Sequence, residues 1–489
     1  MLMAFKDLRE FIEKVRENGQ LHVIEGASLD DDIGSLTEIV AENEVHPMLL
    51  FEKIKGYPEK FRVVSDILTS YTRTTLALGM DPNLSKMEVV RQWKERVKTL
   101  SPIPPKEVSE GPVMQNIENG GQVDLLKFPA PKWHEKDGGK YIGTASAIIT
   151  RDPDAGWVNI GTYRCQVHDA NTLGIYISPG HHGRILREKY WSKGESCPVA
   201  ATFGQDPAIA ITGAYAVPYG MSELDFAGWL RDEPVEVIKG PITGLPIPAT
   251  AEIAIEGEIP PPEQESRVEG PFGEWPGYYA HGAMDEPVIK VKSVMYRNDP
   301  IIAGSPPLKP HLRILGIPFG AASIWDQLEK MAVPDVRGVW TYASSSASGG
   351  GQPFVVISIK QRYPGHAKQA AMVPLGGRTG AYLGRYVVVV DEDIDPTNLE
   401  EVVWAIASRS EPAESIDIVR GTWSTYIDPR MSPKKKASGD ITNSRAIILA
   451  TRPYEWISEF PPVNAISSET RAKAVQKWGA ELDSMKLHS

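Results

Sequence analysis

Hydrophobic and polar positions follow three different patterns along this chain, and the first pattern is helical. Near the start, apolar residues recur on one helical stripe with charged residues opposite, and Gly19 marks the end of the helix. The stripe consists of Phe5, Leu8, Phe11, Ile12 and Val15. A second helical segment is expected around residues 87–100. The pattern predicts a folded start without the continuous apolar segment of a signal peptide.

The middle of the chain, from about residue 113 to about residue 300, follows a second pattern. Short β-branched runs are separated there by glycine and proline, which is typical of strands joined by turns. The runs are YIGTASAIIT, GWVNIGTYRCQV, AEIAIEGEI and PVIKVKSVMY. We therefore expect a β-rich middle domain.

Strand-like and helix-like segments alternate after about residue 318. PFVVISIK and RYVVVVDEDID are predicted to be buried strands, and NLEEVVWAIASR is predicted to be the helix after the second strand. SSETRAKAVQKWGAEL predicts a terminal helix that docks on another domain or subunit. Residues 344–352, rich in serine and glycine, predict a mobile loop. This third region is expected to be α/β.

Two proline-rich seams separate the three patterns. They are SPIPPKEVSEGP, Ser101–Pro112, and AGSPPLKPHLRILGIP, Ala303–Pro318. Because a chain of 489 residues is too long for one small core, two or three domains are expected. The predicted boundaries give three domains and a tail. These are residues 1–108, 109–312 and 313–465, followed by a C-terminal helix and tail, 466–489.

Charge and cysteine content narrow the class of protein. The net charge of -11 repels polyanions, so nucleic acid is a poor partner, although a local basic patch could hold one phosphate group. Cys165 and Cys197 are too few for a disulfide framework, and no apolar run is long enough to span a bilayer. We therefore expect a cytoplasmic protein without a membrane or nucleic-acid partner.

The stretch EGPFGEWPGYYAHG, Glu269–Gly282, contains a candidate pair of functional carboxylates, Glu269 and Glu274. Gly270 and Pro271 disfavour a regular helix, and in a strand residues five apart would point to opposite faces. A turn is therefore expected, and it can bring both side chains to one concave site. Such a pair can perform acid/base chemistry, bind a cation or order a loop.

Other polar residues of the middle region are candidates to share this site. Asn159 and Arg164 fall on a predicted strand in WVNIGTYRCQVHD. The loop SPGHHGR and the segment MSELDFAG follow, and they contribute His181, His182 and Glu223. Taken singly, an asparagine at a strand end is usually a backbone partner, and a histidine in a glycine-rich loop is usually a surface residue. Only their combination points to a function.

That combination resembles the UbiD family of prenylated-FMN-dependent decarboxylases over nearly the whole chain, from FKDLREFIE to YVVVVDEDIDPTNLEEVVWAIASR and the terminal helix. The family's E-G-P-[FY]-G-[ED] loop carries two acids that work with an arginine on a neighbouring strand. The resemblance implies that Arg164, Glu269 and Glu274 are catalytic. It also implies an α+β or α/β multidomain fold. Such a fold has an N-terminal α/β domain, a central split β-barrel that binds the flavin, and a C-terminal α/β oligomerisation domain.

The resemblance also implies a metal and a phosphate site for the cofactor. In the family, an Asn, a His and a Glu bind a divalent metal, usually manganese, with a potassium ion nearby. Asn159, His182 and Glu223 match these ligands, with His181 as the alternative histidine. Lys436 in PKKKASGD matches the lysine that reaches the phosphate. Lys434 and Lys435 are adjacent, and the alternative is that all three form a solvated charge run. An oxygen-rich ligand set suits manganese or magnesium better than zinc.

The chemistry of decarboxylation explains these residue types. Loss of CO2 from an aromatic acid leaves a carbanion that needs an organic electron sink. Arg164 can pair with the substrate carboxylate, Glu274 can deliver the proton that replaces CO2, and Glu269 can orient both. Trp275, Ser178 and His181 match positions that line the substrate pocket in relatives, although Trp275 could instead pack in the core. An aromatic or heteroaromatic carboxylic acid is the expected substrate.

Alternative functions differ in the residues they require. A glycoside hydrolase also uses two carboxylates, but it needs no residues for a metal and a phosphate. A non-catalytic flavin-binding protein would need Asn159, His182 and Glu223 without the catalytic set, and the same enzyme could work in reverse as a carboxylase. No segment resembles a prenyl-transfer site, so a separate flavin prenyltransferase is expected to supply the cofactor. A homodimer or homohexamer is expected from the resemblance.

Overall fold

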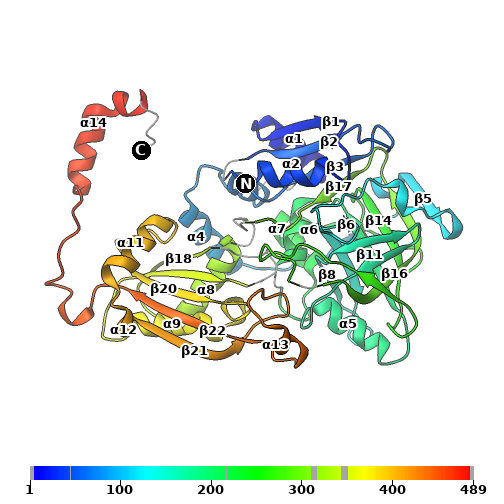
Figure 1. Cartoon of the computed structure of the whole chain (residues 1–489). Coiled ribbons are helices and arrows are strands. Elements are labelled where there is room, and N and C mark those ends of the chain that lie inside the picture. The colour runs from blue at the N-terminus through cyan, green and yellow to red at the C-terminus, as the bar shows by residue number, and fades with distance from the viewer. Residues whose placement is uncertain are drawn as a thin grey trace.

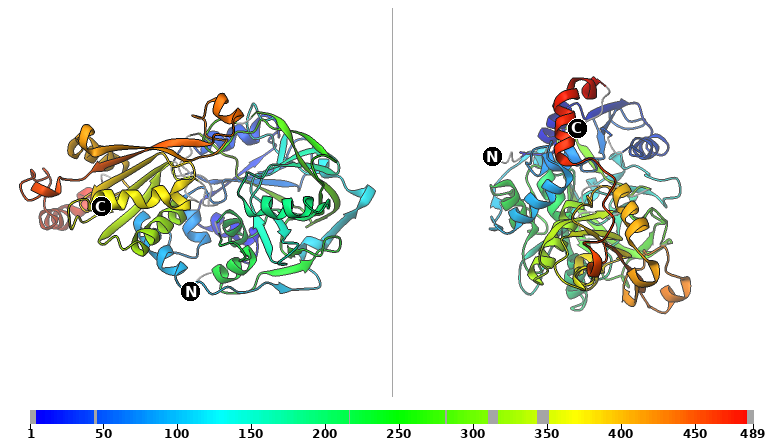
Figure 2. Two further views of the ribbon diagram at one scale, coloured as in Figure 1. Left: turned by 90° about the horizontal axis from the view of Figure 1, so that it is seen from below. Right: turned by 90° about the vertical axis from the view of Figure 1, so that its left-hand side faces the viewer.

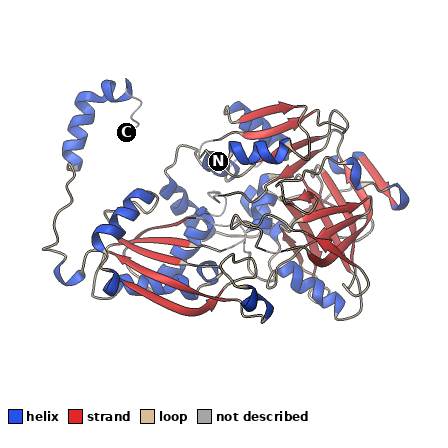
Figure 3. Ribbon diagram, in the orientation of Figure 1, coloured by secondary structure: helices blue, strands red, loops and turns tan. Residues whose placement is uncertain are grey.

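The computed structural model describes residues 5–43, 46–215, 217–280, 282–309, 317–342 and 351–484, and Figure 1 shows how they are arranged. The predicted mobile loop, residues 344–352, lies outside these ranges except for its last two residues. Helices and strands form an N-terminal layer, a strand-rich central part and a C-terminal α/β part (Figure 3). No described helix is long and apolar enough to cross a membrane.

The N-terminal part is a small sheet with helices packed beside it. Its helices are α1 (Leu8–Glu17), α2 (Asp32–Val40), α3 (Tyr71–Ala77) and α4 (Lys86–Val97). Its strands are β1 (Leu21–Glu25), β2 (Met48–Glu52), β3 (Arg62–Ser65) and β17 (Ile301–Gly304), in this order. The predicted apolar stripe of α1 is buried, and Asp7 caps the helix by accepting a hydrogen bond from the Glu10 amide at 2.9 Å. Because β17 comes from about residue 300, the chain returns to its first sheet after building the second.

The central part is a ten-stranded sheet with three flanking helices. Along the sheet the order is β6-β9-β10-β16-β14-β11-β7-β8, with β5 and β15 also pairing with β16. These strands are β5 (Asn116–Asn119), β6 (Lys140–Gly143), β7 (Ser146–Arg151), β8 (Val158–Gly161), β9 (Cys165–Asp169), β10 (Thr172–Ile175), β11 (Cys197–Phe203), β14 (Ile253–Ile259), β15 (Ser266–Glu269) and β16 (Met284–Tyr296). The helices are α5 (His182–Trp191), α6 (Pro207–Ala214) and α7 (Glu223–Arg231). A smaller sheet joins β13 (Pro246–Pro248), β12 (Glu236–Lys239) and β4 (Lys106–Glu107).

The central sheet must curl strongly. Strands β8 and β9 lie near opposite ends of the strand order, yet residues 162–164 are the whole connection between them. An extended link of this length spans only about 3.3–3.6 Å per residue, so the two ends of the sheet have to approach each other. The result is a partly closed barrel (Figure 1). Residues at the end of β8 and the start of β9 therefore lie at the place where this barrel nearly closes.

The C-terminal part is a five-stranded sheet with helices on both faces. The strand order is β18-β19-β20-β22-β21. The strands are β18 (Val336–Tyr342), β19 (Phe354–Ile359), β20 (Tyr386–Asp391), β21 (Ile416–Trp423) and β22 (Thr442–Ala450). The helices are α8 (Ile317–Lys330), α9 (His366–Gly376), α10 (Arg378–Ala381), α11 (Leu399–Arg409), α12 (Pro412–Ser415) and α13 (Pro433–Ala437). Val387 and Val389 pack toward α8 and α9, whereas Val388 and Val390 pack toward α11, as alternation along a buried strand requires.

The last helix, α14 (Ser468–Ser484), stands apart from the body at the end of an extended segment (Figures 1 and 2). Almost all of its described side chains are exposed, and the exposed fraction of Trp478 is 49%. The helix itself was predicted, and its predicted docking on another domain is not seen among the described residues. Docking on another subunit stays a prediction.

Trp93 joins the three parts of the molecule. It projects from α4, is fully buried, and lies 4.7 Å from Phe319 of α8 and 6.1 Å from Trp229 of α7 between ring centroids. One aromatic side chain thus contacts the C-terminal and the central parts from an N-terminal helix.

We expect Trp93→Ala to lower the free energy of unfolding by about 3–5 kcal/mol, because it removes a large buried ring and leaves a cavity at this junction. Urea unfolding followed by circular dichroism measures the change. The matched control is Trp478→Ala on exposed α14, which should change stability by less than about 1 kcal/mol. Equal effects of the two substitutions would show that Trp93 does not hold the parts together.

Candidate active site

The two candidate carboxylates flank a tight loop. Glu269 is the last residue of β15, and Gly270 follows with a φ of 86°, a left-handed conformation that favours glycine. The peptide bond between Gly270 and Pro271 is cis. The amide of Glu274 donates to the Tyr278 carbonyl at 3.1 Å, so the chain turns again directly after the second acid. The predicted turn between Glu269 and Glu274 is confirmed.

A segment before β6 holds this loop in place. The Asp137 carboxylate accepts a hydrogen bond from the Gly273 amide at 3.0 Å and a second from the His134 amide at 3.0 Å. The Gly138 amide donates to the Pro271 carbonyl at 2.8 Å. A Cβ at Gly138 would lie 1.9 Å from the Gly270 carbonyl oxygen, so only glycine fits there. These contacts fix the backbone that carries both acids.

Arg164 binds both acids at once. Its Nε and Nη2 donate to the two oxygens of Glu269 at 2.8 and 2.7 Å, and its Nη1 donates to Glu274. The side chains are buried, with exposed fractions of 8% for Arg164, 2% for Glu269 and 9% for Glu274. The structure thus brings the three predicted catalytic residues together, and the bidentate contact expected for a substrate carboxylate is made to Glu269.

The prediction that Arg164 lies on a strand is wrong. Arg164 is the last residue of the link between β8 and β9. The ladder is broken here because the chain crosses from one end of the curled sheet to the other, and the Thr162 amide donates to the Gly213 carbonyl at 2.9 Å instead of to a strand. The apolar positions change phase at the link, from Val158 and Ile160 to Tyr163 and Cys165, and the strand prediction overlooked this shift.

Aromatic rings and a tyrosine hydroxyl complete the surroundings of Arg164. Its guanidinium lies 4.3 Å from the ring centroid of Tyr176 and 5.1 Å from that of Phe272. The Tyr141 hydroxyl donates to Glu269 at 3.0 Å. Burial opposes the charge on Arg164, but the adjacent carboxylates of Glu274 and Glu269 outweigh it and raise its pKa. The arginine is therefore a permanent positive charge at this site.

A cavity of about 230 Å³ lies beside the catalytic cluster and contains the predicted metal ligands. Asn159, Glu223, His181 and His182 all line it. The Glu223 carboxylate accepts hydrogen bonds from the Asn159 side-chain amide at 2.9 Å and from the Ile160 amide at 2.6 Å. Burial raises the pKa of Glu223 to about 8. The Asn159 Oδ1 atom is buried and has no hydrogen-bond partner among the described residues.

These features fit a hard divalent cation. A buried carboxylate and an orphaned amide oxygen at one cavity are oxygen ligands that a cation would satisfy. Within the described ranges, no cluster of three or more His, Cys, Asp or Glu side chains could hold a metal ion. A metal site in this cavity therefore needs the side-chain oxygen of Asn159 as one ligand. His182 packs edge-on against Tyr219 at 5.2 Å and His181 against Tyr163 at 5.8 Å between ring centroids. Both histidines remain candidates for the third ligand.

Three sequence models of the family named for 3-octaprenyl-4-hydroxybenzoate carboxy-lyase match this chain. The N-terminal domain matches residues 12–93, the Rift-related UbiD domain residues 106–310 and the C-terminal domain residues 314–450. Together they span most of the sequence. The chain belongs to the UbiD family. The three-part fold and the enzyme class expected from the sequence, a carboxy-lyase, are confirmed.

Characterised UbiD relatives are similar over nearly their whole length. A phenolic acid decarboxylase of Streptomyces sp. (strain D7) is 32% identical, over 92% of this chain and 93% of the relative. A pyrrole-2-carboxylic acid decarboxylase of Pseudomonas aeruginosa is 32% identical, over 96% and 97%. An evolved dimeric form of the UbiD-class enzyme HmfF from Pelotomaculum thermopropionicum, solved in complex with prFMN, superposes with a TM-score of 0.79 at 28% identity, covering 95% of this chain and 98% of that chain.

The remaining predicted residues of this UbiD enzyme lie at different places. Lys436 is not among the residues that line the cavity of Asn159 and Glu223, and its Nζ donates to the Ala280 carbonyl at 2.5 Å. Lys435 binds the Thr442 carbonyl at 3.0 Å. Of Lys435 and Lys436, it is therefore Lys436 that contacts the segment after Glu274, at Ala280.

The three predicted substrate-pocket residues come from two segments of the central part. Ser178 and His181 lie three residues apart in one turn, where the His181 amide donates to the Ser178 carbonyl at 3.4 Å. Trp275 is half-buried, and its Cη2 atom would lie 3.1 Å from a Cβ at Gly351 of the C-terminal part. The ring therefore lies where the central and C-terminal parts meet, which agrees with a pocket wall but also with packing between domains.

Sequence reasoning missed several residues of the UbiD site. Tyr141, Asp137 and Gln166 hold Glu269 or its loop, with Gln166 accepting from the Gly270 amide at 3.0 Å. Glu286 on β16 is half-buried near Glu269 and Arg164. The first two lie in KWHEKDGGKY, where a histidine, an aspartate and paired glycines precede a strand and signal a turn. Nothing local links that turn to a loop more than a hundred residues later.

Glu286 should make stability depend on pH. Burial, and then the negative charge of Glu269, raise the pKa of Glu286 to about 7. The folded state therefore holds a proton that the unfolded state releases above the ordinary pKa of 4.5, and the free energy of unfolding falls as pH rises from 4.5 to about 7. Glu286→Gln removes this loss, so the variant should gain stability relative to the parent between about pH 5 and about pH 8 in urea unfolding.

The control for this prediction is Glu263→Gln, an exposed glutamate near the end of the neighbouring strand β14. The difference in free energy of unfolding between Glu263→Gln and the parent should be the same at about pH 5 and at about pH 8. A pH-independent effect of Glu286→Gln would show that the Glu286 carboxyl titrates alike in the folded and unfolded states.

Proposed function

We propose that this UbiD enzyme is a reversible, non-oxidative decarboxylase of an aromatic or heteroaromatic carboxylic acid, and that it uses prenylated FMN. The observation that carries this proposal is the buried ion-pair cluster in which one arginine binds Glu269 and Glu274 together. A non-catalytic flavin-binding protein has no use for two buried carboxylates on one guanidinium. A glycoside hydrolase keeps its two carboxyl groups apart across the scissile bond instead of on a shared cation.

The cofactor proposal rests on the cavity of Asn159 and Glu223 and on a relative. HmfF was solved with prFMN, and the present chain superposes on it over nearly its whole length. We assign Asn159, Glu223 and His182, with His181 as the alternative, to a Mn²⁺ or Mg²⁺ ion that carries the cofactor phosphate. Lys436 is assigned to the phosphate and a K⁺ ion to the same neighbourhood. When bound, prenylated FMN would supply the electron sink that decarboxylation needs.

Arg164 positions the substrate. A guanidinium has five N–H donors, and three of them are used by Glu269 and Glu274. The donors that remain on Nη1 and Nη2 can hold the substrate carboxylate or a neighbouring oxygen. Glu269 fixes the guanidinium at its Nε–Nη2 edge and is itself held by the Tyr141 hydroxyl, so the arginine does not need to reorganise when the substrate arrives.

Glu274 handles the proton. After the carbon–carbon bond to CO2 has broken, a proton from the Glu274 carboxyl group is added to the ring carbon that lost CO2. The resulting carboxylate is stabilised by Arg164 and regains a proton from solvent before the next turnover. In the reverse direction the same carboxylate removes the ring proton. The loop held by Asp137 and Gly138 keeps Glu274 at this position.

The substrate class follows from the relatives and from the pocket residues. The two characterised relatives act on phenolic acids and on pyrrole-2-carboxylic acid. Trp275 offers a flat wall for such a ring, and Ser178 and His181 offer polar groups for a hydroxyl or ring nitrogen. A homodimer or homohexamer is part of the proposal, since the relative HmfF has been solved in an evolved dimeric form.

We expect Glu274→Gln to lower turnover by about 10²- to 10⁴-fold while the flavin and metal still bind, because glutamine keeps the shape but cannot donate a carboxylic proton. The assay is decarboxylation of hydroxybenzoates and pyrrole-2-carboxylate in heavy water. Parent enzyme should place one deuterium at the carbon that lost CO2, and should exchange that hydrogen in added product.

The matched control is Glu135→Gln, an exposed glutamate in the segment that holds the catalytic loop. It should leave the rate and the labelling nearly unchanged. Normal turnover by Glu274→Gln with full cofactor occupancy, or deuterium at another ring position, would assign the proton to a different residue.

The origin of the cofactor gives an independent prediction. Expression in a host without a flavin prenyltransferase should yield folded but inactive protein, and co-expression of that enzyme should restore activity. Absorbance and mass spectrometry of the extracted flavin distinguish prenylated from unmodified FMN. Full activity with unmodified FMN alone would refute this cofactor assignment.

A further inference from the structure

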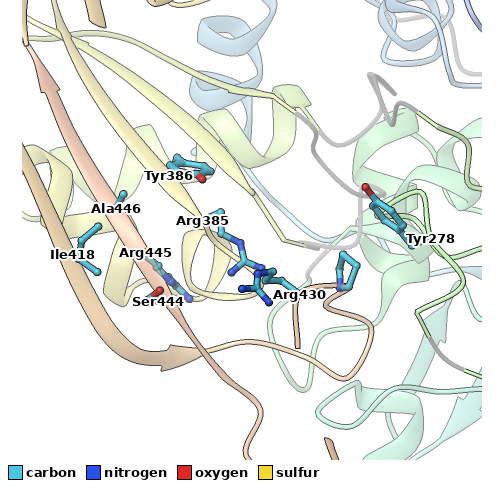
Figure 4. Close-up of a pocket in the computed structure, with 9 residues that line it drawn as sticks. Tyr278, Arg385, Tyr386, Ile418, Arg430, Ser444, Arg445 and Ala446 are labelled. Atoms are coloured by element: carbon cyan, nitrogen blue, oxygen red, sulfur yellow. The ribbon is translucent and has the colours of Figure 1, made fainter. Parts of the chain in front are cut away.

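A second large cavity, of about 670 Å³, lies between the C-terminal part and the catalytic loop (Figure 4). This volume is in the range of small-molecule sites. On one side it is lined by Tyr278, four residues beyond Glu274, and on the other by the beginnings of strands β20 and β22. It contains none of the residues assigned to catalysis or to the cofactor. The full lining is Tyr278, Arg385, Tyr386, Ile418, Pro429, Arg430, Ser444, Arg445 and Ala446.

Three arginines line this cavity and no carboxylate does. Arg385 is bound at 2.7 and 2.8 Å by both oxygens of Asp428, which lies just behind the lining. The guanidinium of Arg430 makes no hydrogen bond or ion pair with any described residue. It extends into the same part of the cavity as Arg385 (Figure 4). Among the described residues, the carboxylate of Asp428 thus pairs with the guanidinium of one of the three arginines, Arg385, in a chain whose net charge is -11.

Arg445 is a rigid positive charge in the wall. Its exposed fraction is 1%, and its two terminal nitrogens donate only to backbone carbonyls, including those of Gly380 at 3.1 Å and Trp423 at 2.8 Å. Its Nε has no partner among the residues described. Carbonyl oxygens orient a guanidinium without neutralising it. Burial, and then the positive charge of Arg385, lower the pKa of Arg445 to about 10, so the two arginines repel each other.

We propose that this cavity binds a small oxyanion, a carboxylate or a phosphate attached to a flat ring. Arginine is suited to such groups because its planar fork matches two oxygens of one anion. An anion among Arg385, Arg430 and Arg445 would offset the uncompensated charge, and the rings of Tyr278 and Tyr386 provide aromatic walls for the rest of the ligand.

The position of this anion site links it to the catalytic loop. The Tyr278 carbonyl accepts the hydrogen bond of the Glu274 amide at 3.1 Å, so a ligand that contacts Tyr278 also contacts the turn that carries Glu274. The site is distinct from the carboxylate position at Arg164. It is a second place where an aromatic acid, or a phosphorylated compound, binds to the same protein.

The experiment is a fluorine NMR titration of the full-length cofactor-loaded protein with 4-fluorobenzoate at constant ionic strength. The expected result is a saturable bound signal that Arg430→Gln weakens by about tenfold or more, because one charge-assisted contact is lost. Arg430 is exposed and its guanidinium binds no side chain or carbonyl among the described residues, so the variant should fold normally. Arg430→Lys should retain part of the affinity. The matched control, Arg471→Gln on exposed α14, changes the net charge equally and should retain the full affinity.

A competition experiment with inorganic phosphate distinguishes a site for oxyanions in general from a site for aromatic carboxylates. If inorganic phosphate displaces 4-fluorobenzoate from the signal that depends on Arg430, the site accepts oxyanions in general; if it does not, the site accepts aromatic carboxylates. The proposal is overturned if no saturable signal depends on Arg430, or if Arg471→Gln weakens binding as strongly as Arg430→Gln. The titration measures binding, so its outcome is independent of whether the enzyme decarboxylates any acid.

Discussion

The buried ion-pair cluster of Arg164 with Glu269 and Glu274 is the interaction on which the site depends. Two carboxylates removed from water in one small volume would be strongly unfavourable without a cation that contacts both. Arg164 meets this requirement by giving its Nε–Nη2 edge to one acid and Nη1 to the other. The three side chains must lie within hydrogen-bonding distance of one another, because a buried charged group that lacks a hydrogen-bond partner is costly in free energy. Much of the surrounding structure serves this requirement.

The loop and the sheet each contribute to that geometry. The loop from Gly270 to Gly273 is held by Asp137, Gln166 and the backbone of Gly138, where a side chain would collide with the loop. The sheet contributes through its curl, since three residues connect β8 to β9 across the partly closed barrel. The curl places Asn159, on β8, and Arg164, before β9, on the same side of the molecule. The cavity lined by Asn159 and the ion-pair cluster of Arg164 are therefore close together because of the fold.

Two arginine groups in this protein are in opposite electrostatic states. Arg164 is balanced by two carboxylates, which raise its pKa, and two aromatic rings lie against its guanidinium. In the C-terminal cavity three arginines line the wall, Asp428 behind it binds Arg385, and the pKa of Arg445 is lowered. The first arrangement is suited to positioning and proton transfer. The second is suited to binding an anion from solution.

The sequence by itself determined the elements and the chemistry of the catalytic loop. Alternating and helical patterns predicted α1, α4, α11 and the principal strands, and the turn chemistry of EGPFGE predicted that Glu269 and Glu274 approach each other. Local patterns have this power because they report which face of an element is buried and where the backbone must turn. The family's arginine and metal ligands could also be matched residue by residue.

Only the tertiary structure decided what lies between segments distant in the chain. It showed that Arg164 lies in a link and not on a strand, that Tyr141 and Asp137 hold the acids, and that α14 stands apart from the body. It also grouped Arg385, Arg430 and Arg445 around one cavity, although they are ordinary surface or strand residues in the sequence. Contacts of this kind depend on how the sheets curl and pack, and that geometry is set by the sum of many long-range contacts and leaves no periodic signal in any one segment.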